Sequence, residues 1–127
     1  MHVKEETGAR LKTELLPYLL LTQTAERFYS KPRGYAGDFF TIECIYRNTP
    51  AGSGRLGPLL DECFLDGLPA RAVRNRRGLL SDEIRRTVDG TGGEVRIASL
   101  ACGPAREVFD VFQTLDDADR PRVTLLD

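Results

Sequence analysis

The fold of this chain is decided by one stretch near its end, Glu94-Val95-Arg96-Ile97-Ala98-Ser99-Leu100-Ala101-Cys102-Gly103-Pro104-Ala105-Arg106-Glu107. Residues 95–100 form a short run of β-branched and apolar side chains after a glycine-rich segment, which is typical of a buried strand. Small residues follow at once, and a helical pattern then runs from Arg106 to Leu115. A strand that turns tightly through small residues into a helix leaves backbone N–H groups facing a cleft. Such a turn can receive a nucleotide-like ligand.

A second apolar strand is predicted at residues 122–126, and it is followed by Asp127. An acid about 20 residues past a glycine turn is where nucleotide-binding β-α-β units carry the carboxylate that binds ribose. The fingerprint G-x-G-x-x-G is not met, because only Gly103 among its expected positions is glycine. The pattern therefore disfavours a nicotinamide or flavin dinucleotide.

The region before the first strand is predicted to be helical. The first expected helix covers residues 3–16 and ends at Pro17, and the second begins at Thr22 or Thr24 and ends at Tyr29. The third covers residues 39–47 and is capped by Asp38. Two further helices are expected at residues 57–65 and 69–89. The Gly/Pro/Ser-rich segment 48–58 is typical of a mobile flap. Helices placed before the first strand often cover the ligand crevice, so residues 1–93 are interpreted as a cap and residues 94–127 as the opening β-α-β unit.

Only two convincing strands are present, and both lie at the end of the chain. A parallel pair needs helices on both faces and further neighbouring strands. We therefore expect an α/β fold of which this chain is the N-terminal part, mostly helical and with an incomplete sheet. On its own it is expected to bind a cofactor weakly or not at all.

Composition places the chain among soluble globular proteins, with 41% hydrophobic and 29% charged residues. The net charge of -1 gives no bias toward nucleic acid or anionic membranes. Three cysteines without C-x-x-C spacing predict neither a disulfide framework nor a metal site, which fits a reducing cytoplasm. The most apolar run, Leu15 to Leu21, is too short to span a bilayer and is interrupted by Pro17.

The turn after the first strand resembles motif I of the class I S-adenosylmethionine-dependent methyltransferases, in which a strand ends in a small-Cys-Gly-Pro-small sequence. Ala101 and Ala105 stand where that family usually has glycine, and Ser99 stands where it often has an acid. The resemblance implies a Rossmann-like fold with S-adenosyl-L-methionine as cofactor, and it implies that Asp127 takes the ribose hydroxyls. The cofactor-binding residues implied are Leu100, Ala101, Cys102, Gly103, Pro104, Ala105 and Asp127.

A second group of candidate residues lies in the loop Lys31-Pro32-Arg33-Gly34-Tyr35-Ala36-Gly37-Asp38. Its two glycines let the loop double back and present Arg33, Tyr35 and Asp38 in one direction. Alternatively, Asp38 is only a helix cap and Tyr35 only a packing residue. The loop and the later Val-Arg-Asn-Arg-Arg sequence at 73–77 are similar to bacterial extracellular-factor 3-hydroxypalmitic acid methyl ester synthases, quorum-signal methyltransferases that esterify a 3-hydroxy fatty acid. By that resemblance the loop lines the cofactor and acceptor pocket.

Within the predicted helix 69–89, residues 71–86 carry six arginines against two acids, Asp82 and Glu83, and form the most basic segment of the chain. Arginines in such a run usually form a solvent-exposed helix face. The alternative is that they form a surface that binds an acidic partner such as an acyl carrier protein. Nucleic acid is disfavoured, because no aromatic residues interleave the arginines. His2, the single histidine, is too close to the terminus to be expected as a catalytic base, and no histidine is placed to activate Cys102.

These resemblances together imply an S-adenosylmethionine-dependent methyltransferase that esterifies the carboxylate of a 3-hydroxy fatty acid or a similar small acid. A carboxylate acceptor is already anionic, so no strong general base is required. Arg33 is the candidate for pairing with the acceptor carboxylate, while Tyr35 and Asp38 shape the pocket. Two alternatives stay open: another nucleotide-binding protein, such as an oxidoreductase or regulator, and a truncated, non-catalytic interaction module.

Overall fold

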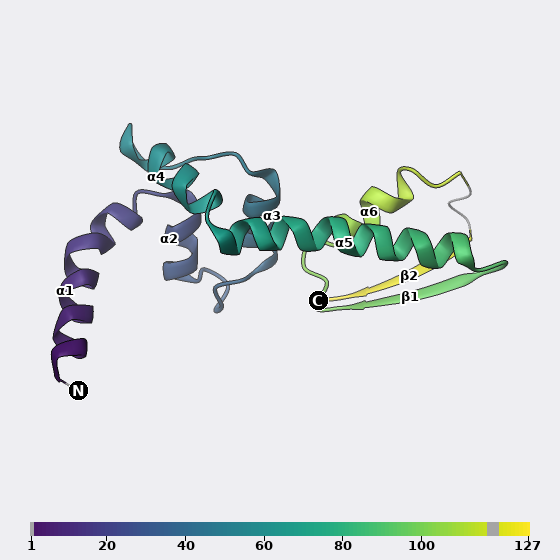
Figure 1. Cartoon of the computed structure of the whole chain (residues 1–127), viewed down its shortest axis with the longest axis horizontal. Helices are drawn as coiled ribbons and strands as arrows, with labels where there is room; N and C mark the ends of the chain where they lie inside the picture. Colours follow the sequence, from purple (N-terminus) through teal and green to yellow (C-terminus); the bar gives the residue numbers. More distant parts are fainter. Residues whose placement is uncertain (1, 117–119) are drawn as a thin grey trace. The chain divides into compact units, whose positions relative to one another are not determined.

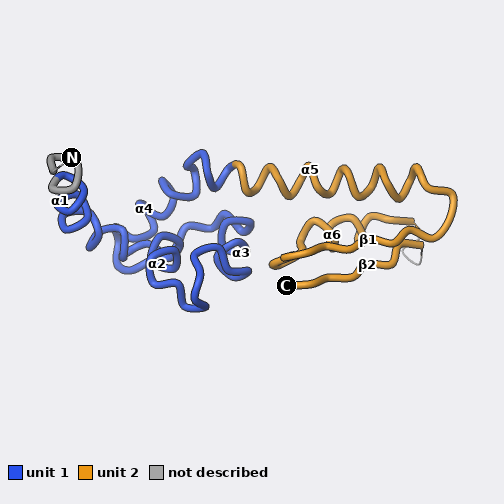
Figure 2. The backbone as a smooth tube through the Cα atoms, turned by 90° about the horizontal axis from the view of Figure 1, so that it is seen from below, with its two compact units in different colours: residues 1–71 blue, residues 72–127 orange. Residues whose placement is uncertain are grey.

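The computed structural model describes residues 2–116 and 120–127, with side chains from Thr7 onward. Its elements are shown in Figure 1 and are, in chain order, α1 (His2–Leu19), α2 (Gln23–Ser30), α3 (Phe39–Arg47), α4 (Leu56–Leu65), α5 (Leu68–Gly90), β1 (Val95–Leu100), α6 (Arg106–Phe112) and β2 (Pro121–Leu126). Contacts divide the chain into two compact units, residues 1–71 and residues 72–127, which Figure 2 draws in different colours. The domain boundary predicted after residue 93 stays a prediction.

The two strands form a parallel sheet and are joined by α6. Their register places Val95 opposite Pro121 and Leu100 opposite Leu126, so both strands end at the same edge of the sheet. The predicted β-α-β unit is thereby confirmed. The described part of the chain is mostly helical with a small parallel sheet, as an α/β segment should be.

One face of this sheet is covered by helices, because α5 and α6 lie on the same side of it (Figure 1). The apolar core of the second unit is formed by residues that are at most 6% exposed: Val88, Val95, Val108 and Val111. Three hydrogen bonds hold α6 against α5. The Arg77 guanidinium binds the Asp110 carboxylate through two hydrogen bonds of 2.6 and 2.7 Å, and the Ser81 hydroxyl donates to the Glu107 carbonyl over 3.2 Å.

The first unit is built around α2, which packs on α3 and α4. Its core contains Ile45 and Leu65, each 2% exposed, and the rings of Phe28 and Phe64, whose centroids lie 5.6 Å apart. Thr22 rather than Thr24 is the N-cap of α2, and its hydroxyl accepts a hydrogen bond from the Ala25 N–H.

Two helix ends differ from the sequence predictions. Pro17 lies inside α1 instead of ending it, because a proline removes one N–H donor and the ladder resumes at once, with Leu20 N donating to the Leu16 carbonyl over 2.9 Å. Helix α6 ends at Phe112 rather than Leu115. The N–H of Thr114 donates to the carbonyl only three residues earlier, the tightened pattern of a helix end.

The segment 48–58 is fastened rather than open, which corrects the expectation of a mobile flap. Its backbone pairs with the chain before α2, since Gln23 N donates to the Ala51 carbonyl and Ser53 N to the Leu21 carbonyl, over 3.0 and 2.8 Å. At Gly52 the two backbones approach so closely that a Cβ atom there would lie 2.3 Å from the Leu21 carbonyl oxygen. Glycine is therefore required at this position, a constraint that composition alone does not reveal.

Candidate functional site

The turn between β1 and α6 has three residues in the left-handed conformation. Ala101, Gly103 and Ala105 have φ values of 50°, 53° and 49°. Glycine adopts this conformation freely, whereas an alanine there costs roughly 1–2 kcal/mol. Two alanines that persist in it show that their surroundings impose the shape of the turn.

This turn is bonded to the end of β2. The N–H of Cys102 donates to the Leu126 carbonyl over 3.1 Å, and the N–H of Gly103 donates to Oδ1 of Asp127 over 3.0 Å. The register brings these residues together, because the two parallel strands end opposite each other. Asp127 Oδ2 has no hydrogen-bond partner among the described residues, and Asp127 is exposed. The predicted proximity of the turn and Asp127 is confirmed, while cofactor binding there stays a prediction.

The turn is open to solvent on one side and anchored on the other. Leu100 is 72% exposed and Ala101 is exposed, whereas the Ala105 methyl is 2% exposed. Cys102 is half-buried, and its thiol makes only a long contact of 3.8 Å with the Gly103 carbonyl. Within the described ranges no group of three or more metal-binding side chains occurs. This edge therefore offers the exposed carboxylate of Asp127 and the small, exposed side chain of Ala101.

The loop before α3 is organised by a buried carboxylate. Asp38 is 0% exposed and caps α3, accepting a hydrogen bond of 2.7 Å from the Thr41 N–H. It also accepts from Arg27 Nη2, at 3.0 Å to one oxygen and 3.3 Å to the other. Burial alone would raise the pKa of Asp38, but the hydrogen bonds from Thr41 and Arg27 and the charge of Arg27 outweigh it and hold the pKa below its usual value. Asp38 is an ionised structural anchor as well as the predicted cap.

Arg33 and Tyr35 are the exposed members of the same loop. The Arg33 guanidinium lies over the Phe39 ring, 4.2 Å from its centroid, and its Nε is 4.0 Å from Oδ2 of Asp38. Its side chain remains 52% exposed, and Tyr35 is 51% exposed. The structure thus brings Arg33 and Asp38 together and leaves the Arg33 N–H donors accessible to an anion. These residues belong to the first unit, and the turn at 101–105 belongs to the second.

Three of the six arginines of α5 form ion pairs with acids of the described residues: Arg71 with Asp66, Arg77 with Asp110, and Arg86 with Glu83. Arg85 instead donates a hydrogen bond to the neutral hydroxyl of Thr114. Beside the two hydrogen bonds from Arg77, the pKa of Asp110 lies below its usual value. Docking of an acidic carrier protein on this helix stays a prediction.

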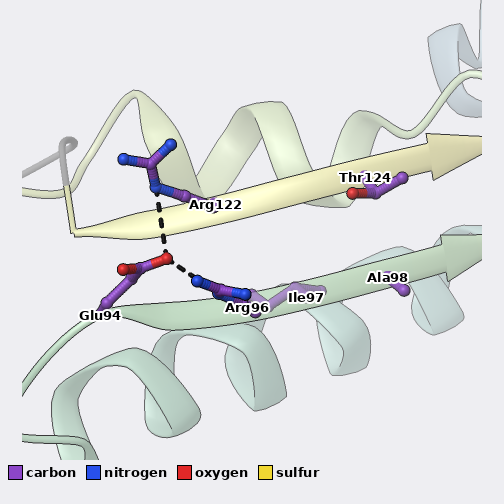
Figure 3. Close-up of a pocket in the computed structure, with 6 residues that line it drawn as sticks. All are labelled: Glu94, Arg96, Ile97, Ala98, Arg122 and Thr124. Carbon is purple, nitrogen blue, oxygen red and sulfur yellow. Dashed lines mark hydrogen bonds and ion pairs between the residues drawn. The ribbon is translucent and has the colours of Figure 1, made fainter.

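A hollow of about 610 Å³ lies on the sheet itself, on the face opposite the helices. Figure 3 shows the six residues that line it: Glu94, Arg96, Ile97, Ala98, Arg122 and Thr124. Sequence reasoning missed this feature, although the alternation of polar and apolar residues along 94–98 and 122–126 was a usable signal.

Two further residues were missed because their partners are distant in sequence. Asp61 is 0% exposed and accepts hydrogen bonds from Thr24 N and Ala51 N, over 2.9 and 3.0 Å. Arg27 holds the Asp38 carboxylate and lies over the Phe40 ring, 4.4 Å from its centroid. For Asp61, the signal was an acid that directly follows the apolar residues Leu59 and Leu60 in the helix 56–65. For Arg27, the neighbouring sequence contains no signal that would indicate its bond to Asp38.

Comparison with known proteins identifies the family. Residues 34–127 match the model of a family described as "Putative methyltransferase". Over 75 residues the chain is 32% identical to the uncharacterized protein YnbC of Escherichia coli (strain K12), an alignment that covers 57% of this chain and 13% of that protein. The chain thus spans far less than two thirds of that relative's length. No solved structure matches significantly. In the described part of the chain, no helix combines the length and apolar character needed to cross a membrane. The family model covers most of the chain, including Tyr35, Asp38 and the turn at 101–105 with Asp127 but not Arg33, and the chain therefore belongs to this methyltransferase family.

Proposed function

We propose that this chain contributes the cofactor-binding edge and part of the acceptor site of an S-adenosylmethionine-dependent methyltransferase with a Rossmann-like sheet. The acceptor is the carboxylate of a small acid of the 3-hydroxy fatty acid class, and the product is its methyl ester. The family match supports methyl transfer, which requires a methyl donor.

The observation that carries the proposal is the hydrogen bond between Gly103 N–H and Asp127 Oδ1. It fixes the orientation of the carboxylate and leaves Oδ2 to accept from a ligand. A ribose presents two adjacent hydroxyl donors, which an oriented carboxylate can bind. The small residues from Ala101 to Ala105 allow a ligand to approach the backbone closely. The residues present therefore fit an adenosine-containing cofactor.

The acceptor is assigned to Arg33. Its guanidinium is held by Phe39 and Asp38 yet stays half exposed, so it can form the bidentate pair that arginine makes with a carboxylate. Tyr35 adds an exposed ring and hydroxyl to the same loop, and Asp38 maintains the loop's shape from within.

In this reaction the main task of the protein is to place the acceptor carboxylate against the methyl donor. S-adenosylmethionine supplies an electrophilic methyl group when bound. A carboxylate acceptor is already anionic at neutral pH, so the chain needs to orient it and exclude water rather than remove a proton.

The proposal is tested by titrating the intact gene product with S-adenosylmethionine and, separately, with NAD. Binding of the methyl donor at micromolar concentration, with NAD binding at least about 10-fold weaker, is the expected result. Equal or tighter binding of NAD would favour the oxidoreductase or regulator. Failure to bind either ligand would favour a non-catalytic module.

The acceptor assignment has its own test. Arg33→Ala should raise the acceptor KM by about 10-fold or more while leaving cofactor affinity unchanged, because a charge-assisted pair is lost from the acceptor alone. Arg47→Ala is the matched control, since Arg47 is also an exposed arginine paired with an acid, Glu43. An equal loss of cofactor and acceptor affinity in Arg33→Ala would contradict the assignment.

A further inference from the structure

The uncovered face of the sheet has a graded chemical character. Alternate residues of β1 and β2 point to this face, and those opposite each other in the register form three cross-strand pairs. From the start of the strands to their end these pairs are Arg96 with Arg122, Ala98 with Thr124, and Leu100 with Leu126. The face is therefore charged at one end, small in the middle and apolar at the other end.

This face lacks the covering that a parallel sheet normally has. Parallel sheets are packed on both sides, whereas α5 and α6 lie together on the other side (Figure 1). Leu100 is 72% exposed and Leu126 is 53% exposed at the apolar end. Exposed leucines in neighbouring strands form an apolar surface that gains free energy when a partner buries it.

At the charged end of this face, the positive charges outnumber the negative charges by one. Like charges directly opposite each other destabilise a sheet, and Arg96 and Arg122 are such a pair. Glu94 partly relieves the repulsion, because its Oε1 lies 2.9 Å from Arg96 Nε and 3.3 Å from Arg122 Nε (Figure 3). Two arginines against one glutamate leave a net charge of about +1 at the hollow. The arginine side chains are 81% and 77% exposed.

The guanidinium groups keep donors for a second acid. Glu94 engages only the Nε atom of each arginine, so the Nη groups face the hollow without a protein partner among the described residues. The hydroxyl of Thr124, which also lines the hollow, has no hydrogen-bond partner in the described residues either. An acidic side chain placed here would meet donors from both strands.

The dimensions suit a short helix. Four residues separate the arginine pair from the leucine pair along each strand, which is about 13 Å. A helix covers that distance in about nine residues. The small side chains of Ala98 and Thr124 at the centre let a helix approach the sheet closely, above the hollow of about 610 Å³.

We propose that this face binds an amphipathic helix that carries acidic residues at one end and leucine-like residues along the rest of its buried side. The acidic end pairs with Arg96 and Arg122, and the apolar side covers Leu100 and Leu126. The proposal rests on charge complementarity and on the spacing of the three pairs, and it is independent of the methyl-transfer proposal.

Two synthetic helical peptides of about 14 residues test it, long enough to cover the face with a turn to spare. They share a leucine-rich face and differ only in carrying two glutamates or two lysines at one end. In fluorescence anisotropy the glutamate peptide should bind this chain about 10-fold more tightly, as expected for two exposed ion pairs. The double variant Arg96→Glu/Arg122→Glu should prefer the lysine peptide. Arg86→Glu, an equal charge change on α5, should leave the original preference intact.

A variant without charge reversal separates an effect on binding from an effect on folding. Arg96→Gln/Arg122→Gln introduces no new charge and leaves Glu94 as the charged side chain at this end, so it should lose the preference for the glutamate peptide while keeping the helical circular dichroism of the wild type. Equal binding of the two peptides to the wild type, or a preference that survives the glutamine variant, would overturn the proposal. It would also be overturned if sedimentation showed a dimer of this chain that dissociates in the glutamine variant, since a second copy would then occupy the face.

Discussion

The backbone N–H of Gly103 donates a hydrogen bond to the carboxylate of Asp127 over 3.0 Å, although 24 residues separate them in the sequence. The bond exists because β1 and β2 are parallel and end opposite each other. It joins the turn and the acid, which had only been expected to lie close together, into one site. The arrangement is held by the backbone and leaves the second carboxylate oxygen available.

The left-handed alanines give the first prediction. Ala101→Gly should raise the free energy of unfolding by about 0.5–1 kcal/mol, because relief of the left-handed strain exceeds the entropy that glycine adds to the unfolded chain. Ala105→Gly should gain less, since its buried methyl is also lost. Urea denaturation measures both values. Ala98→Gly, in β1, is the control and should lose about 0.5–1 kcal/mol. A destabilised Ala101→Gly variant would contradict the strain assigned to the turn.

The second prediction concerns the buried carboxylate of Asp38. Asp38→Ala should lower the free energy of unfolding by about 3 kcal/mol or more, because it removes the cap of α3 and leaves the largely buried Arg27 without its partner. Asp38→Asn should lose less, since asparagine also caps helices well. The order wild type, asparagine, alanine in thermal denaturation is the expected result. An alanine variant as stable as the asparagine variant would show that the cap contributes nothing.

The same residue predicts a pH dependence. The pKa of Asp38 in the folded state lies below its ordinary value of 3.8. The stabilisation is therefore complete well above that value and is lost as the pH falls toward the lower pKa of the folded state. The stability difference between the wild type and Asp38→Asn should shrink as the pH is lowered through 4 and below. A difference that stays constant over this range would contradict an ionised Asp38.

Asp61 should be intolerant even of asparagine. Both of its hydrogen bonds come from backbone N–H groups, Thr24 N and Ala51 N, which need two acceptor oxygens. Asparagine offers one acceptor and would place its NH₂ group against the other donor, so Asp61→Asn should cost about 2 kcal/mol or more. Hydrogen exchange at the Ala51 amide should accelerate in this variant, and exchange at the Gly103 amide should not. Unchanged protection at Ala51 would show that Asp61 does not fasten the segment 48–58.

The pair between α5 and α6 should show coupling. In a double-mutant cycle, Arg77→Met and Asp110→Asn should give an interaction free energy of about 1 kcal/mol, a partly exposed bidentate pair. The coupling should fall in high salt and at a pH low enough to protonate Asp110. Additive losses would mean that the two side chains act independently.

The sequence was sufficient where signals are local. The strand at 95–100, its turn into a helix, the Asp38 cap and the parallel partner ending at Asp127 all follow from periodicity and short-range chemistry. These features depend on residues within a few positions of each other, or on the general rule that a β-α-β unit brings strand ends together.

The sequence failed where the decisive contact is distant or backbone-determined. The anchoring of segment 48–58 depends on Asp61 and on the approach of Gly52 to the Leu21 carbonyl, and in both cases the contacting groups lie far apart in the sequence. Pro17 predicts a helix end from its local chemistry, whereas the hydrogen bonds that follow it carry α1 on to Leu19. The left-handed conformation of Ala101 and Ala105 does not follow from the sequence, because residue identity does not specify φ.

The affinity of the intact gene product for S-adenosylmethionine, measured by calorimetry with and without the change Asp127→Asn, tests the central claim most directly. The account predicts that the variant binds about 10- to 100-fold more weakly, because a hydrogen bond to a charged group is lost at the ribose. Asp89→Asn, an exposed acid on α5, should bind as the wild type does. Unchanged affinity in Asp127→Asn would contradict the claim that the Gly103–Asp127 edge holds the methyl donor.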